Sequence, residues 1–156
     1  MRTIRTEPLT AEAFAPFGEV LEPTGDFRLI NAGLCRRHHD RARLDFGTGR
    51  AGISVFDAEP RALPYDFDLI ERHPEGSQAF LPMTQAPFLV IVAESPAVTP
   101  RAFVTNGAQG INLHRGTWHG VLTPLHAPGL FAVVDRIGEG ANLEEHRFTE
   151  PWRVTA

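Results

Sequence analysis

The sequence predicts a mainly β protein, a sandwich or barrel, with one short helix near the N-terminus. Three observations favour this fold class. Short apolar segments of strand type recur along the chain. Turn residues separate them, because thirteen prolines and fourteen glycines are spread over the 156 residues. The segments between them lack helical patterns, and the crossovers of a doubly wound α/β sheet would require such helices.

The helix signal lies close to the start of the chain. Thr10 is a favourable N-cap, residues 11–17 carry the helical pattern, and Gly18 offers a left-handed stop. We therefore expect a helix over residues 11–17.

The strands follow as short apolar or alternating runs bounded by turn residues. Phe88–Val92 is the most apolar run and therefore the most buried candidate. Asn106–Gly107 is a strong signal for a two-residue hairpin. Strands are expected at 52–56, 67–71, 88–92, 102–105, 111–113, 120–122 and 130–134. A barrel of such strands has a mouth or interior that can hold one small ligand.

Composition excludes several kinds of chemistry. All fifteen basic residues are arginine, which removes Schiff-base catalysis, pyridoxal phosphate and a phosphate-binding loop built on lysine. The net charge of −4, without a basic run, argues against nucleic acid or an anionic membrane as partner. With three serines and no Gly-x-Ser-x-Gly elbow, a serine hydrolase is poorly supported.

The chain also carries signals of its compartment. Cys35 is the single cysteine and cannot close an internal disulfide, which favours a reducing environment. The first residues lack the apolar stretch of a secretory signal, and the longest apolar run, residues 88–93, is too short to span a bilayer. We expect one cytoplasmic domain over residues 1–156.

Polar chemistry gathers first around residues 71–78. Glu71 and His73 are two apart and share one face of an extended strand, and Gln78, past a Pro-Glu-Gly turn, can return to that face. A second cluster ends in Gly116-Thr117-Trp118-His119, where the glycine permits a tight turn before His119. We expect these side chains to meet in one site.

The two clusters resemble the metal motifs of cupin barrels. Those barrels place two histidines and a glutamate in one motif and a final histidine in a second. Here Glu71 replaces the first histidine and Gln78 replaces the glutamate, so the expected ligand set is Glu71, His73, Gln78 and His119. Imidazole and carboxylate suit a divalent first-row metal, whereas an amide is a poor ligand. The metal and its identity therefore stay open.

Two further polar clusters have other interpretations. Residues 31–40 form a donor-rich loop with a glycine, and the planar fork of an arginine there could grip a small carboxylate. Asp135-Arg136, together with Asn142–His146, is interpreted as a local salt-bridge network. Trp118 is either core filling or the apolar wall of the pocket beside His119.

As a set, these segments resemble the ureidoglycolate lyase family, also called ureidoglycolate hydrolases, within the cupin superfamily. The resemblance runs in order through nearly the whole chain, and its most specific parts are Glu-Arg-His-Pro-x-Gly-Ser-Gln and Asn-Leu-Glu-Glu-His. The matching segments are residues 9–20, 30–33, 37–40, 71–82, 87–90, 116–119, 133–136 and 142–146.

The resemblance implies a cupin-type, jelly-roll-like barrel that forms a homodimer. It also implies a carbon–nitrogen lyase of allantoin and purine catabolism, which splits ureidoglycolate into glyoxylate and urea without an organic cofactor. On this hypothesis His119 or Glu71 takes the hydroxyl proton, and Arg37 or Arg115 holds the substrate carboxylate. The other expected substrate-binding residues are Asn31, His39 and Trp118.

Two alternatives stay open at the level of sequence. One is a metal-dependent cupin isomerase or dioxygenase, and the other is a non-catalytic cupin that binds a small carboxylic acid. The residues alone also leave open whether a hydrolytic route would release ammonia instead of urea.

Overall fold

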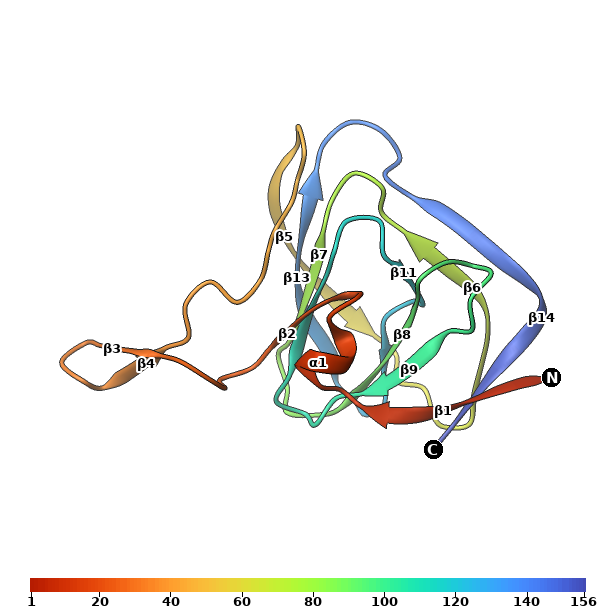
Figure 1. Ribbon diagram of the computed structural model, residues 1–156, viewed down its shortest axis with the longest axis horizontal. Coiled ribbons are helices and arrows are strands. Elements are labelled where there is room, and N and C mark those ends of the chain that lie inside the picture. Colours follow the sequence, from red (N-terminus) through yellow and green to blue (C-terminus); the bar gives the residue numbers. More distant parts are fainter.

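Two β-sheets pack face to face, and a two-stranded arm projects from them (Figure 1). A computed structural model describes residues 1–156. The elements in chain order are β1 (Arg2–Pro8), α1 (Ala11–Phe14), β2 (Gly18–Leu21), β3 (Arg28–Ile30), β4 (Cys35–Arg37), β5 (Arg50–Ala58), β6 (Tyr65–Arg72), β7 (Gln78–Pro82), β8 (Phe88–Ala93), β9 (Arg101–Val104), β10 (Gly110–Leu113), β11 (Trp118–His119), β12 (Thr123–Pro124), β13 (Gly129–Ile137) and β14 (Glu144–Thr155).

The larger sheet closes on itself. Its strands run in the order β11-β6-β14-β1-β9-β8, and β11 also pairs with β8, so that six strands form a ring, with β12 added against β8. The second sheet has the order β2-β10-β7-β13-β5, and β3 pairs with β4 in the arm. The predicted mainly β, cupin-type barrel with a short N-terminal helix is confirmed.

The central strand β8 is buried on both faces. Phe88, Val90 and Val92 belong to the apolar cluster between the two sheets. Leu89 and Ile91 belong to a second cluster, whose buried members all come from strands of the ring. Burial on both sides explains why this segment is apolar throughout rather than alternating.

The helix is shorter than predicted. Thr10 caps it, since the backbone N–H of Ala13 donates to the Thr10 hydroxyl oxygen at 3.2 Å. The helix ends at Phe14, and Gly18 is not a left-handed stop but the first residue of β2. A Cβ at Gly18 would lie 1.8 Å from the carbonyl oxygen of Asn112 on β10, so close strand approach requires the glycine.

Two of the strand predictions are wrong. Asn106–Gly107 does not form a hairpin, because β9 pairs within the ring while β10 pairs with β2 and β7 in the other sheet. The turn therefore carries the chain from one sheet to the other. Residues 120–122 lie between β11 and β12 and are not in a strand. The sequence interpretation also missed β1, the arm strands and β14.

The one α-helix has four residues, and nothing in the chain qualifies as a helix able to cross a bilayer.

The contact at Gly18 gives a stability prediction. Gly18→Ala forces β2 away from β10 and should lower the free energy of unfolding by about 3 kcal/mol, measured by urea denaturation. Gly33→Ala is the matched control, because its added Cβ meets no atom within 4 Å and only its φ of +81° is strained. We expect a loss of about 1 kcal/mol there. Equal losses in the two variants would contradict the clash.

Candidate active site

A cavity of about 410 Å³ lies between the ring and the five-stranded sheet. Strands of both sheets and the loop from β13 to β14 line it. The lining residues are Phe56, Glu71, His73, Gln78, Phe80, His119, Leu122, Asp135, Arg136, Gly138, Gly140, Ala141, Asn142 and Leu143. This size is within the range of small-molecule sites.

Backbone pairing brings a carboxylate and two imidazoles together. Glu71 and His119 are directly opposite each other on the antiparallel strands β6 and β11, so their side chains share a face. His73 follows β6, and its carbonyl oxygen accepts a hydrogen bond from the backbone N–H of Gly116 at 3.0 Å, in the turn that precedes β11. The ligand atoms of Glu71, His73 and His119 all lie within 4.8 Å of one another.

Both imidazoles are held in the same way. Nδ1 of His73 lies 2.9 Å from the carbonyl oxygen of Asn142, and Nδ1 of His119 lies 2.8 Å from that of Gly120. A carbonyl only accepts, so each Nδ1 carries a proton, and in the neutral ring each Nε2 then has a free lone pair. Both Nε2 atoms are buried without a partner. This arrangement is typical of histidines that ligate a metal or act as bases.

Burial sets the protonation of the site. The pKa of His119 is lowered to about 4. Desolvation is the largest cause, the hydrogen bond to Gly120 raises the pKa more weakly, and the nearby His73 lowers it. His119 is therefore neutral near pH 7. Desolvation also raises the pKa of Glu71, which His73 partly offsets and Glu145 on β14 reinforces. A carboxylate of raised pKa is a stronger base than an ordinary one.

Gln78 lines the same cavity from the other sheet. It is 6% exposed and lies directly opposite Asp135, with Gln78 on β7 and Asp135 on β13. The side-chain Nε2 of Gln78 donates to Oδ2 of Asp135 at 3.1 Å, and its Oε1 has no partner. Asp135 is not in the close group formed by Glu71 and the two histidines.

The sequence interpretation missed three polar residues of this cavity. Asp135, Arg136 and Asn142 were interpreted as a salt-bridge network, yet all three line the cavity. Asn142 has a φ of +43° in a loop that also contains Gly138 and Gly140. Its backbone carbonyl holds His73, and its side-chain oxygen accepts from the backbone N–H of Glu75 at 2.8 Å. Asparagine tolerates this left-handed conformation, so an asparagine in a loop with glycines is the signal in the sequence that could have indicated this turn.

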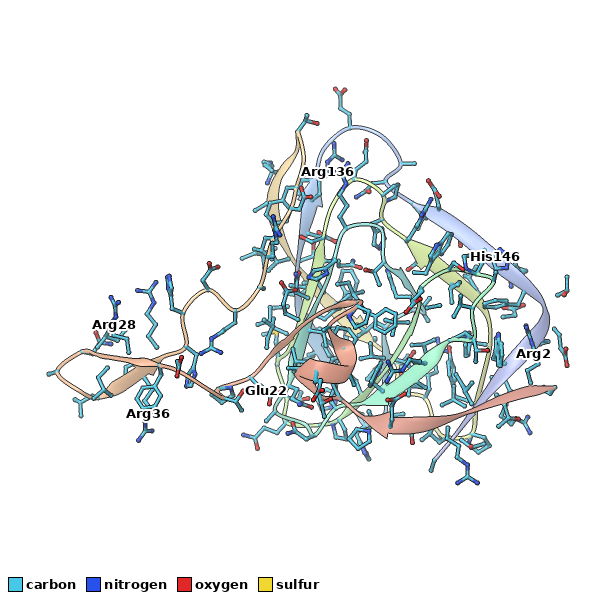
Figure 2. All side chains as sticks on the ribbon, viewed as in Figure 1. Arg2, Glu22, Arg28, Arg36, Arg136 and His146 are labelled. Carbon is cyan, nitrogen blue, oxygen red and sulfur yellow. The ribbon has the colours of Figure 1, made fainter.

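Arg136 is the one arginine among the lining residues. Its side chain is 6% exposed, and Figure 2 places it at the end of β13. One of its terminal nitrogens, Nη1, lies 3.4 Å from Glu75, while Nε is buried without a partner.

The expected substrate-binding residues are placed elsewhere. Asn31, Arg37 and His39 belong to the segment of the projecting arm (Figure 2 labels Arg28 and Arg36 there) and do not line the cavity between the sheets. Arg37 and His39 line a separate hollow of about 410 Å³, together with Asp26, Phe27, Arg28 and Arg41.

Arg115 and Trp118 are also outside the cavity. Arg115 donates to the carbonyl oxygen of Pro74 at 2.7 Å and lies 3.7 Å from Asp45, so it supports a loop. Trp118 packs on the second apolar cluster with the guanidinium of Arg72 over its ring, at 4.8 Å from the ring centre. Arg72 in turn pairs with Glu144.

Comparison with known proteins identifies the family of the chain. The family described as ureidoglycolate lyase matches residues 1–155. A protein of Rhodobacter capsulatus named ureidoglycolate lyase is 60% identical over 99% of both chains. A protein of the same name from a Chelativorans species is 49% identical, over 99% of this chain and 97% of its own. Another from Pseudomonas aeruginosa is 48% identical, over 96% of this chain and 93% of its own. The chain therefore belongs to the ureidoglycolate lyase family.

Proposed function

We propose that this protein is a ureidoglycolate lyase that splits ureidoglycolate into glyoxylate and urea. The observation that carries the proposal is the convergence of Glu71, His73 and His119 in a cavity of suitable size. Membership of the family and the names of relatives at 46–60% identity support a lyase over a cupin dioxygenase, an isomerase or a non-catalytic binder. On this proposal the protein acts in allantoin and purine catabolism, in the cytoplasm.

The bond changes define what the site must do. The hydroxyl O–H bond and the carbon–nitrogen bond to the ureido group break, and the hydroxyl oxygen becomes the aldehyde oxygen of glyoxylate. The nitrogen keeps the bonding electrons, gains a proton and leaves as urea. The site therefore has to accept one proton, return one proton and hold a carboxylate.

Two side chains suit the proton transfer. His119 is neutral and has a free Nε2, and Glu71 has a raised pKa and lies beside it. Either group takes the hydroxyl proton when it is not occupied by an ion. Because both are held by paired strands, the substrate meets a preorganised base.

We propose Arg136 as the partner of the substrate carboxylate, in place of Arg37 or Arg115. It is the one arginine that lines the cavity and its Nε is buried without a partner, whereas neither Arg115 nor Arg37 lines the cavity. A guanidinium presents parallel N–H groups to a carboxylate.

A divalent metal ion fits the same residues. Glu71, His73 and His119 would hold it, since two unpartnered Nε2 atoms and a carboxylate form a ligand set of the kind that first-row metals take. Three protein ligands leave positions open for substrate, as in catalytic sites. A bound ion supplies Lewis acidity, which lowers the pKa of a hydroxyl group in contact with it. Its charge would also offset that of Glu71 in a cavity that receives an anion.

We also propose a homodimer. Ile53 and Val55 on the edge strand β5 face away from the core, as do Leu81 and Met83 at the end of β7. Ile53, Val55 and Met83 are 77%, 63% and 58% exposed. An apolar sheet face of this kind is typical of a surface that a second copy covers.

The reaction itself is tested by product analysis. Purified protein incubated with ureidoglycolate should release urea and glyoxylate in equal amounts and no ammonia. His119→Ala should lower the rate by about 10³-fold, because it removes a buried base or ligand. His126→Ala, at an exposed histidine, is the control and should be as active as the unmodified protein. Near-normal turnover in a folded His119→Ala variant would remove His119 from the mechanism.

Metal binding is tested without turnover. Calorimetric titration of chelator-treated protein with Ni²⁺ or Co²⁺ should show one site per chain, and His73→Ala should weaken it by ~100-fold. His126→Ala should bind like the unmodified protein. Equal affinity in His73→Ala and the unmodified protein would place the ion elsewhere.

The dimer is tested by light scattering after gel filtration. The unmodified protein should have about twice the mass of one chain, and Val55→Glu should shift it to one chain by placing a charge in the interface. Val98→Glu, on a turn outside this face, should stay dimeric. A monomeric unmodified protein, or a dimer that tolerates Val55→Glu, argues against this surface.

A further inference from the structure

The wall of the cavity formed by the five-stranded sheet carries a polar pair outside the Glu71–His73–His119 group. Gln78 and Asp135 face each other across β7 and β13 and both line the cavity. Neither group belongs to the three whose ligand atoms converge. The two ends of the cavity thus differ in chemistry, with an imidazole–carboxylate end on the ring and an amide–carboxylate end on the other sheet.

The hydrogen bond between these residues fixes how the amide points. An ionised carboxylate only accepts hydrogen bonds, so the NH₂ of Gln78 faces Asp135 at 3.1 Å and Oε1 faces the other way. That oxygen is buried and unpartnered, on a residue only 6% exposed. A buried acceptor without a donor is unfavourable, and the native protein sustains the cost where a ligand supplies the donor.

The ligand group that matches this wall is rich in N–H donors. Two acceptors side by side, an amide oxygen and a carboxylate, suit a group with several N–H bonds. A second carboxylate would be repelled there, so the acid end of a substrate is directed away from Asp135 and toward Arg136, the arginine of the same cavity.

We propose that Gln78 and Asp135 bind the ureido N–H groups of the substrate and determine specificity for a ureido substituent, with Gln78 acting as an acceptor rather than a metal ligand. This inference rests on the proposed function, since ureidoglycolate carries its N–H donors at one end and its hydroxyl and carboxylate at the other. The pair holds the departing urea, while the ring side of the cavity faces the hydroxyl group and Arg136 faces the carboxylate. An analogue that lacks the donors leaves the buried Oε1 of Gln78 unpaired, which is the condition for strong discrimination.

A binding experiment with unreactive ligands tests the pair without turnover. N-carbamoylglycine has the ureido group and carboxylate but no hydroxyl, and in N-acetylglycine a methyl group replaces the terminal NH₂. Calorimetry on the metal-loaded protein should show at least about tenfold tighter binding of N-carbamoylglycine, the equivalent of one hydrogen bond. In Gln78→Met and Asp135→Asn that preference should fall to about twofold or less, while the affinity for N-acetylglycine is unchanged.

Controls separate recognition from folding and from metal binding. Gln85→Met, at an exposed glutamine, should keep the full preference. Both site variants should bind Ni²⁺ with unchanged affinity. If Gln78→Met does not fold, Asp135→Asn decides the question, because it keeps the size of the side chain. The inference is overturned if the variants keep the preference for N-carbamoylglycine, or if the unmodified protein has no such preference. It is also overturned if the variants lose affinity for Ni²⁺ and for both ligands together.

The outcome is distinguishable from failure of the proposed function. If unmodified protein binds N-carbamoylglycine selectively but releases no urea from ureidoglycolate, the lyase assignment fails and the ureido-binding pair stands. If it releases urea and shows no selectivity, the lyase stands and the pair does not.

Discussion

Two hydrogen bonds from imidazole to backbone carbonyl determine what this cavity can do. They link His73 to Asn142 and His119 to Gly120, and they leave both Nε2 atoms unpartnered in the close group with Glu71. Without them either ring could rotate or change tautomer, and the group would lose its order. The carbonyls belong to a loop residue and to the residue after β11, so the rest of the fold serves to hold those two peptide units in place.

Strand pairing supplies the remaining order. The register that sets His119 opposite Glu71 and Gln78 opposite Asp135 fixes one pair on each sheet. Since the two sheets pack through a shared apolar cluster, the pairs stay at a constant separation across the cavity. The polar pairs of the site are therefore divided between the sheets, with Glu71–His119 on one and Gln78–Asp135 on the other.

Local sequence patterns predicted what local geometry controls. The two-residue period placed Glu71 and His73 on one face, the apolar run identified β8, and Thr10 identified the helix start. Patterns failed where distant strands decide the outcome. Asn106–Gly107 has hairpin chemistry, yet its flanking strands pair in different sheets. Asp135 and Asn142 were interpreted as part of a local salt-bridge network, because their actual partners, Gln78 and His73, are 57 and 69 residues away in the chain.

The position of β14 has a consequence for biosynthesis. This strand lies between β6 and β1 and pairs with both, in parallel with β1 from Arg2↔Trp152 to Arg5↔Thr155. Residues 144–155 emerge from the ribosome after every other strand, so the edge of β1 that pairs with β14 stays unpaired until these residues have been synthesised. Closure of the ring is therefore a late step of folding that joins the two ends of the chain. Topologies of this kind fold slowly, and strand edges are exposed until the ring closes.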